Sequence, residues 1–198
     1  MATVIRTFGR QGLAGLRLLL VLTLLTGVLY PAVVLGLGQG LLRHQADGSL
    51  LTRGGAVVGS ALVGQSFAGP QWFHPRPSAA GSGYDAMAGA GSNLGPRNPR
   101  LLAQVQSRRA AVAAADGVAP GAVPPDALTA SASGLDPHVS PAYAAQQVPR
   151  VARERGLPEA SVAALVRAHA RGRELGFLGQ PRVNVLELNL ALASAGGG

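Results

Sequence analysis

The stretch TASASGLDPHVSP (129–141) concentrates the residue types of a hydrolytic site, with Ser131 and Ser133 followed by Asp136 and His138. A serine hydrolase needs a serine held against a histidine that a carboxylate orients. Neighbours on one loop rarely reach that geometry, and neither serine lies in a Gly-x-Ser-x-Gly elbow. The sequence therefore favours a structural turn. The alternative interpretation is the active site of a membrane-anchored, exported serine hydrolase.

The end of this stretch has the pattern of a helix start. Ser140 is directly followed by Pro141. Serine is a preferred N-cap residue, and proline fits the first helical position because its missing N–H is not needed there. Asp-Pro before it is typical of a turn. We expect Asp136 to order the turn and Ser140 to cap the helix that follows.

Composition excludes several other kinds of site. All 17 basic residues are arginine and there is no cysteine. The chain therefore has no lysine for a phosphate-binding loop or a Schiff base, and no thiolate. Its aromatic residues make up only 4% of the chain, so we expect no nucleic-acid partner despite the net charge of +8.

Metal and anion sites find little support as well. The four histidines are too far apart for a sequence-local metal motif, and we expect no metal site and no tightly bound cofactor; they are His44, His74, His138 and His169. The glycine-rich segment 88–99, with Arg97, precedes a helix start, where backbone N–H groups suit an anion. The same pattern is typical of an ordinary turn.

An uncharged apolar run extends from Leu18 to Leu42. About 20 apolar residues in a helix span a bilayer, whereas the apolar part of a cleaved signal peptide has roughly 7 to 15. We therefore predict a retained transmembrane helix over residues 18–42. Arginines are more numerous before this run than after it, with Arg6, Arg10 and Arg17 preceding it and Arg43 and Arg53 following it. The positive-inside rule then predicts a cytoplasmic tail over 1–17 and a single exported domain over 43–198.

The exported domain shows signals for three helices. The first starts at Asn98-Pro99 and stops at Gly117, with apolar Leu101, Leu102, Val105 and Val112. The second starts at Ser140-Pro141 and contains Pro149, which predicts a kink or a restart. The third runs through LPEASVAALVRAHARG to Gly172, with Val162, Leu165, Val166 and His169 on one face.

Strand signals lie before and after these helices. Residues 44–98 are rich in Gly, Ser and Pro, so helices are not expected there, but AVVGSALVGQSF predicts a strand and a turn. PRVNVLELNLAL fits a strand with a phase slip or a strand passing into a short helix. Trp72 and Phe73, among prolines, suit either a docking surface or a core plug. The predicted fold class is α/β or α+β, with about three helices on a small sheet.

Five ordered sequence blocks follow the anchor: GSALVGQSF (59–67), WFHPRPSA (72–79), GSNLGPRNP (91–99), LTASASGLDPHVSPAYAAQQVPRVARERGL (128–157) and ELGFLGQPRVNVLELNLAL (174–192). With these blocks, the chain resembles the C subunit of the Kdp potassium-transporting P-type ATPase. It departs from the family pattern at His74-Pro75-Arg76, where a glycine-arginine pair is usual before Pro-Ser, and at Gln146, where a bulky aromatic residue is usual.

The resemblance implies an accessory subunit that is not itself an enzyme, in a bacterial inner membrane. Its partners would be a potassium-channel-like subunit and an ATP-hydrolysing P-type subunit of the same complex. The family is described as a catalytic chaperone that raises the ATP affinity of the hydrolysing subunit. The resemblance links Gln147 to that role, and ATP association would come with it. If the exported orientation holds, any effect on ATP affinity must be indirect.

Overall fold

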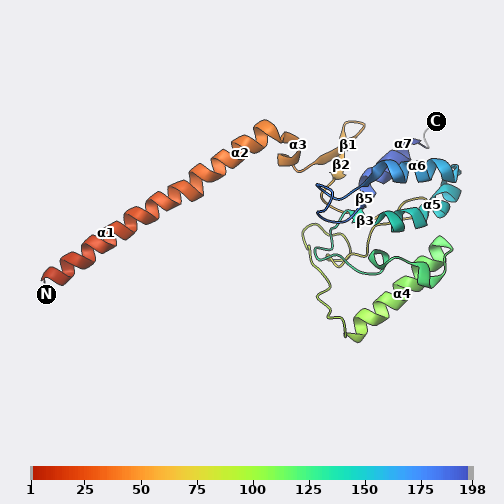
Figure 1. The fold of residues 1–198 in the computed structure, drawn as a ribbon, viewed down its shortest axis with the longest axis horizontal. Coiled ribbons are helices and arrows are strands. Elements are labelled where there is room, and N and C mark those ends of the chain that lie inside the picture. The colour runs from red at the N-terminus through yellow and green to blue at the C-terminus, as the bar shows by residue number, and fades with distance from the viewer. Residues whose placement is uncertain (1, 196–198) are drawn as a thin grey trace. The chain divides into compact units, whose positions relative to one another are not determined.

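The computed structural model describes residues 2–195, and the chain divides into two units, residues 1–49 and 50–198. Figure 1 shows the path of the chain through both units. Among the described residues, the first unit is helical, and the second contains the strands and the candidate site residues discussed below.

The N-terminal unit is a long apolar helix that runs through three consecutive elements. These are α1 (Ala2–Leu24), the π-helical segment η1 (Leu25–Leu29) and α2 (Tyr30–Leu41), followed by the short α3 (Arg43–Ala46). Residues 6–41 are long and apolar enough to cross a membrane, with a mean hydropathy of 2.5 over the most apolar window. The predicted apolar helix is therefore confirmed, and it ends at Leu41.

The π-helical segment ends at Leu29, two residues before Pro31. A proline inside an α-helix has no N–H for the ladder, and its ring collides with the carbonyl four residues earlier. Here the N–H of Tyr30 bonds to the carbonyl of Leu25, five residues back. This wider turn gives the ring room, so the helix continues past Pro31 instead of breaking.

The second unit begins with a hairpin of β1 (Leu50–Arg53) and β2 (Ala56–Ser60), with an irregular register after Leu51. A long segment without helices or strands leads to α4 (Pro99–Asp116) and two short 3-10 turns, η2 (Pro120–Ala122) and η3 (Pro125–Ala127). The remaining elements are β3 (His138–Val139), α5 (Pro141–Arg155), α6 (Glu159–His169), β4 (Ala170–Arg171), β5 (Arg182–Asn184) and α7 (Val185–Ala195).

A small antiparallel sheet in the order β3-β5-β4 anchors the helices of this domain. Helix α4 contacts α5, α5 contacts α6, and α6 contacts α7, while β5 contacts α5, α6 and α7. Figure 1 shows α5, α6 and α7 gathered around β5. Antiparallel strands with helices packed beside them make this an α+β domain, in agreement with the predicted mixed class.

Local capping signals predicted the helix starts correctly. The Asn98 side chain accepts a hydrogen bond from the N–H of Arg100 (2.9 Å), and Gly117 ends α4 in the left-handed conformation. The Ser140 hydroxyl accepts one from the N–H of Tyr143 (3.0 Å). The alternative of a strand passing into a helix is confirmed by β5 and α7.

Several sequence expectations were wrong. The third helix does not extend to Gly172 but ends at His169, because Ala170 and Arg171 leave it to pair with β5. Besides α4, α5 and α6, the described part of the domain contains α7, the short helix that was one of the two alternatives for its segment. A short helix, α3, lies in the segment expected to contain none. Of the apolar residues of α4, Leu102 is 59% exposed.

The core lies between α5, α6, α7 and the sheet. Its largest fully buried apolar side chains include Leu188 and Leu192 of α7 and Val162 of α6. The helix containing Pro149 is continuous, so it does not restart there. Phe73 is completely buried in the same cluster, which confirms the core-plug alternative for this residue.

Candidate functional site

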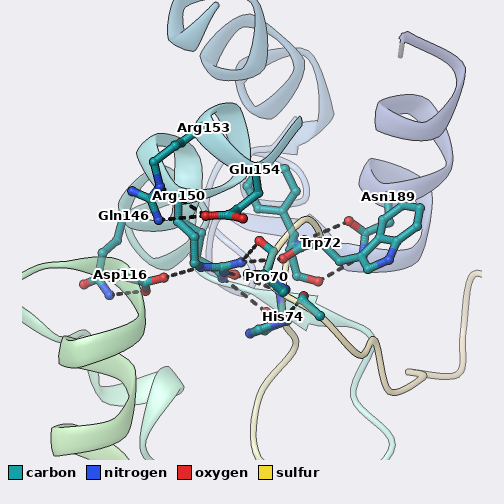
Figure 2. A network of polar contacts seen from close by, with 12 residues as sticks. Pro70, Trp72, His74, Asp116, Gln146, Arg150, Arg153, Glu154 and Asn189 are labelled. Atoms are coloured by element: carbon teal, nitrogen blue, oxygen red, sulfur yellow. Dashed lines mark hydrogen bonds and ion pairs between the residues drawn. The ribbon is translucent and has the colours of Figure 1, made fainter. Parts of the chain in front are cut away.

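Helix α5 presents a polar stripe toward the inside of the domain. Gln147 and Arg150 lie one turn apart on its buried face, with exposed fractions of 0% and 2%. Buried charged and amide groups are costly unless every polar atom finds a partner. Figure 2 shows how Arg150 reaches the segment around Trp72, here called the Trp72 segment (residues 69–76), and Asp116 of helix α4.

Arg150 is the centre of this network. Its Nε–H donates to Asp116 Oδ1 at 2.8 Å, and both side chains of this ion pair are 2% exposed. Its terminal nitrogens donate to the carbonyl oxygens of Pro70 and Trp72 and to Gln147 Oε1. One guanidinium thus connects α4, α5 and the Trp72 segment.

Gln147 and Asn189 each form a pair of hydrogen bonds with the backbone of one residue in the Trp72 segment. The Gln147 side chain accepts from the N–H of His74 (2.7 Å) and donates to its carbonyl (3.2 Å). Asn189, on α7, accepts from the N–H of Phe73 (3.0 Å) and donates to its carbonyl (2.9 Å). An irregular segment lacks the regular backbone hydrogen bonds of a helix or a sheet. These side-chain bonds take their place and fix the backbone of the segment between two helices.

Trp72 itself is half-buried beside this network. Its ring lies 5.9 Å from that of Phe67, and the Arg155 guanidinium lies 4.1 Å from its centroid. Arg155 also donates to the carbonyl of Gln71 (3.1 Å). A cation over an aromatic face is attracted to the ring. The Trp72 side chain is therefore used for packing within the domain.

The residues that depart from the family pattern also have partners here. Gln146 donates to Asp116 Oδ2 (2.8 Å), beside the Arg150 pair. Arg76 forms an ion pair with Asp136 (3.1 Å). The His74 ring bonds to the Gly69 carbonyl (2.9 Å). Burial of this ring lowers the pKa of His74.

The stretch 129–141 forms the predicted turn. Asp136 Oδ1 accepts from the backbone N–H of His138 (3.0 Å) and lies 3.2 Å from its Nδ1. Burial alone would raise the pKa of Asp136, but the hydrogen bonds from His138 and the charge of Arg76 lower it. Ser140 donates its hydroxyl to Asp126 (3.0 Å) while it caps α5. Every polar group named here has a role in local structure.

The arrangement needed for a serine hydrolase is not formed in the described part of the chain, residues 2–195. Within residues 2–195, Ser131 and Ser133 line a different cavity from His138, and neither serine is hydrogen-bonded to it. Ser133 Oγ accepts from the N–H of Leu135 instead (3.1 Å). The Asp136–His138 pair therefore orders the turn and is not bonded to either candidate serine.

No other expected ligand set converges. Within residues 2–195 no group of three or more potential metal ligands comes together; His169, for instance, bonds to the Leu165 carbonyl (2.8 Å). The glycine-rich segment 88–99 forms the turn before α4, with Gly91 packed on the Ala132 backbone and Arg97 exposed. Anion binding at this turn stays a prediction.

The sequence did not reveal the Asp116–Arg150 pair or the role of Asn189. Asp116 and Arg150 are 34 residues apart, and Asn189 is 116 residues from Phe73. One available signal was the position of Arg150, which lies one helical turn after Gln147 on the same face as the apolar Ala144 and Val151. Another was an asparagine in the middle of the apolar run of α7.

The fold and the site define a class of protein: an α+β domain that follows one apolar helix in the chain, and whose buried polar network bonds to its own backbone and side chains. A family profile described as the c chain of the K+-transporting ATPase, KdpC, matches residues 13–194. A KdpC subunit of a potassium-transporting ATPase from Kineococcus radiotolerans is 60% identical over 195 residues, covering 98% of this chain and 99% of the relative.

Other relatives agree. The corresponding subunit of Gemmatimonas aurantiaca is 56% identical over 174 residues, with 87% of each chain covered. That of Rhodospirillum rubrum is 55% identical over 171 residues, with 86% of this chain and 89% of the relative covered. The chain belongs to the KdpC family. It is a subunit of the potassium-transporting ATPase and not the catalytic subunit, and its one apolar helix is compatible with a single membrane pass.

Proposed function

We propose that this chain is the accessory subunit that assembles with a channel-like subunit and an ATP-hydrolysing P-type subunit, and that it raises ATP affinity indirectly. Its domain would lie outside a bacterial inner membrane, and Gln147 would act as a positioning residue. Family membership supports the assembly. The positioning role is supported by one feature, the pair of hydrogen bonds between the buried Gln147 amide and the His74 backbone.

This bond gives Gln147 a role that does not require contact with nucleotide. Its Oε1 already accepts from both the His74 N–H and Arg150. Its Nε2 donates to the His74 carbonyl, and the side chain has no exposed area. A change at Gln147 therefore alters the Trp72 segment, and through it the surface that the domain offers to the other subunits.

An indirect effect is a coupling between conformations of the complex. A subunit that binds more tightly to the conformation with high nucleotide affinity shifts the population toward it. Such couplings typically change affinity about 5- to 150-fold. We expect ATP itself to bind the chain weakly and in a salt-sensitive manner, through arginine charge and loop N–H groups.

The matched pair Gln147→Ala and Asn189→Ala tests this role. Each variant removes one side chain that holds one residue of the Trp72 segment, from α5 and from α7 respectively. In the purified complex, both should raise the ATP concentration needed for half-maximal hydrolysis by similar factors. Leu102→Ala, at an exposed position on α4, should leave it unchanged. A loss limited to Gln147→Ala would contradict positioning and support direct nucleotide contact.

Two further measurements test assembly and orientation. The wild-type chain should co-purify from its native membranes with two larger membrane subunits, and its absence from such a complex would end the proposal. A single cysteine from Ser133→Cys in this cysteine-free chain should react with an impermeant maleimide in intact cells. Labelling only after the cytoplasmic side is opened would reverse the orientation.

A further inference from the structure

The loop between β4 and β5 exposes a cluster of large apolar side chains. Every residue from 172 to 181, here called the Phe177 loop, is exposed. Within four consecutive positions, Leu175 is 82%, Phe177 68% and Leu178 50% exposed. Single apolar residues on a surface are ordinary, but a cluster of this kind marks a contact site.

The Phe177 loop is ordered by its own hydrogen bonds. Glu174 and Leu178 exchange two backbone hydrogen bonds of 2.9 Å each, as an antiparallel bridge. The carboxylate of Glu174 is also paired with Arg182 at 2.5 Å. Leu175, at the tip, adopts a φ of 52°, which is unfavourable for a leucine. The loop thus holds its apolar side chains outward in a fixed shape, so that docking orders little further chain.

The charges around the loop indicate what covers it. Arg171 is paired with Glu187 (3.4 Å) and Arg182 with Glu174, whereas the side chain of Arg173 forms no ion pair within residues 2–195. Lipid-binding segments carry clusters of free basic residues, and the exposed Glu174 carboxylate would face anionic headgroups. A second copy docked symmetrically would bring two Arg173 side chains together.

An apolar centre with a polar, ion-paired rim is instead the anatomy of a protein interface. We propose that the Phe177 loop docks into an apolar hollow, bordered by a carboxylate that meets Arg173, on another subunit of the potassium-transporting ATPase. This inference rests on the proposed function. Phenylalanine and leucine fill the hollow, and the single unpaired arginine gives the contact its register.

Photo-crosslinking in the assembled complex tests the occupant directly. The photoreactive amino acid p-benzoylphenylalanine replaces Phe177 in the full-length chain, and the complex is illuminated in native membranes. We expect a product that contains this chain and one larger subunit, identified by mass spectrometry. The same amino acid at Leu102, which is 59% exposed on α4, should give little of that product. Crosslinking to lipid alone, or to a second copy of this chain, would overturn the inference.

Substitutions give a second readout. In the full-length chain, Phe177→Ser and Arg173→Glu should each reduce the amount of the other subunits retained after a salt wash at least several-fold, while Leu102→Ser should not. Thermal unfolding of the purified chain in detergent verifies that each variant is folded. Retention equal to wild type in both loop variants would refute the docking site. If the wild-type chain itself retains no partner, the proposed function fails as well, so the two failures are distinguishable.

Discussion

The Arg150 network and the Phe177 loop are opposites in chemistry and in exposure. Around Arg150, charged and amide side chains are fully buried and bonded to their own domain. In the Phe177 loop, leucine and phenylalanine are exposed to solvent. The comparison teaches that polarity alone does not show where this subunit meets a partner. The Arg150 network satisfies its polar groups inside the domain, whereas the Phe177 loop leaves apolar side chains exposed.

The largest effect should come from breaking the Arg150 network. Arg150→Met leaves the Asp116 carboxylate buried without its cation, and removing one partner of a buried pair costs about 3–5 kcal/mol. The adjacent Arg153→Met, in an ion pair whose arginine is 67% exposed, should change stability by less than about 1 kcal/mol. Denaturant unfolding of the full-length chain in detergent measures both. Similar small losses in the two variants would show that the buried network is not a stabilising element.

The helix caps should give a smaller effect. Ser140→Ala should destabilise the chain by about 0.5–2 kcal/mol, because it removes the bond to the Tyr143 N–H. The hydroxyl of the same serine also bonds to Asp126, whereas the side chain of Asn98 makes its capping bond to Arg100. We therefore expect Asn98→Ala to cost less than Ser140→Ala in the same unfolding experiment. If Asn98→Ala costs more, the stability that a capping side chain contributes does not follow the number of hydrogen bonds it makes.

The helix caps depend on local sequence, whereas other features of the domain depend on contacts between distant residues. Asn98, Gly117 and Ser140 were predicted correctly because a cap depends on residues within one helical turn. The end of α6 was predicted wrongly because Ala170 pairs with Val183, a contact that local sequence does not encode. The Arg150 network was missed for the same reason, since its members come from α4, α5 and the Trp72 segment. The Phe177 loop was missed because apolar residues in a glycine-rich stretch do not indicate whether they are buried.

A pH dependence should come from the Trp72 segment. Burial lowers the pKa of His74 below its ordinary value of 6.5, so the unfolded chain binds a proton more readily than the folded one. The stability contributed by neutral His74 is present above pH 6.5 and is lost as the pH falls toward the lowered folded pKa. His74→Gln should reduce the stability lost between pH 7.5 and 5.5, measured by thermal unfolding in detergent. An identical pH dependence in the variant would show that another group is responsible.

The smallest effect, and one of opposite sign, is expected at Leu175. This leucine occupies a left-handed conformation, which costs an ordinary residue about 1–2 kcal/mol and which asparagine tolerates better. Its side chain is 82% exposed, so Leu175→Asn removes almost no packing. The variant should therefore unfold with a free energy equal to wild type or higher by up to about 1 kcal/mol. In the complex it should nevertheless weaken retention of the other subunits, because the apolar tip is lost. If Leu175 served folding, replacing it would lower the free energy of unfolding. If it serves docking, replacing it should leave that free energy equal or higher and weaken the contact with the other subunits. Loss of stability without loss of retention would assign Leu175 to the fold and remove the contrast with Arg150.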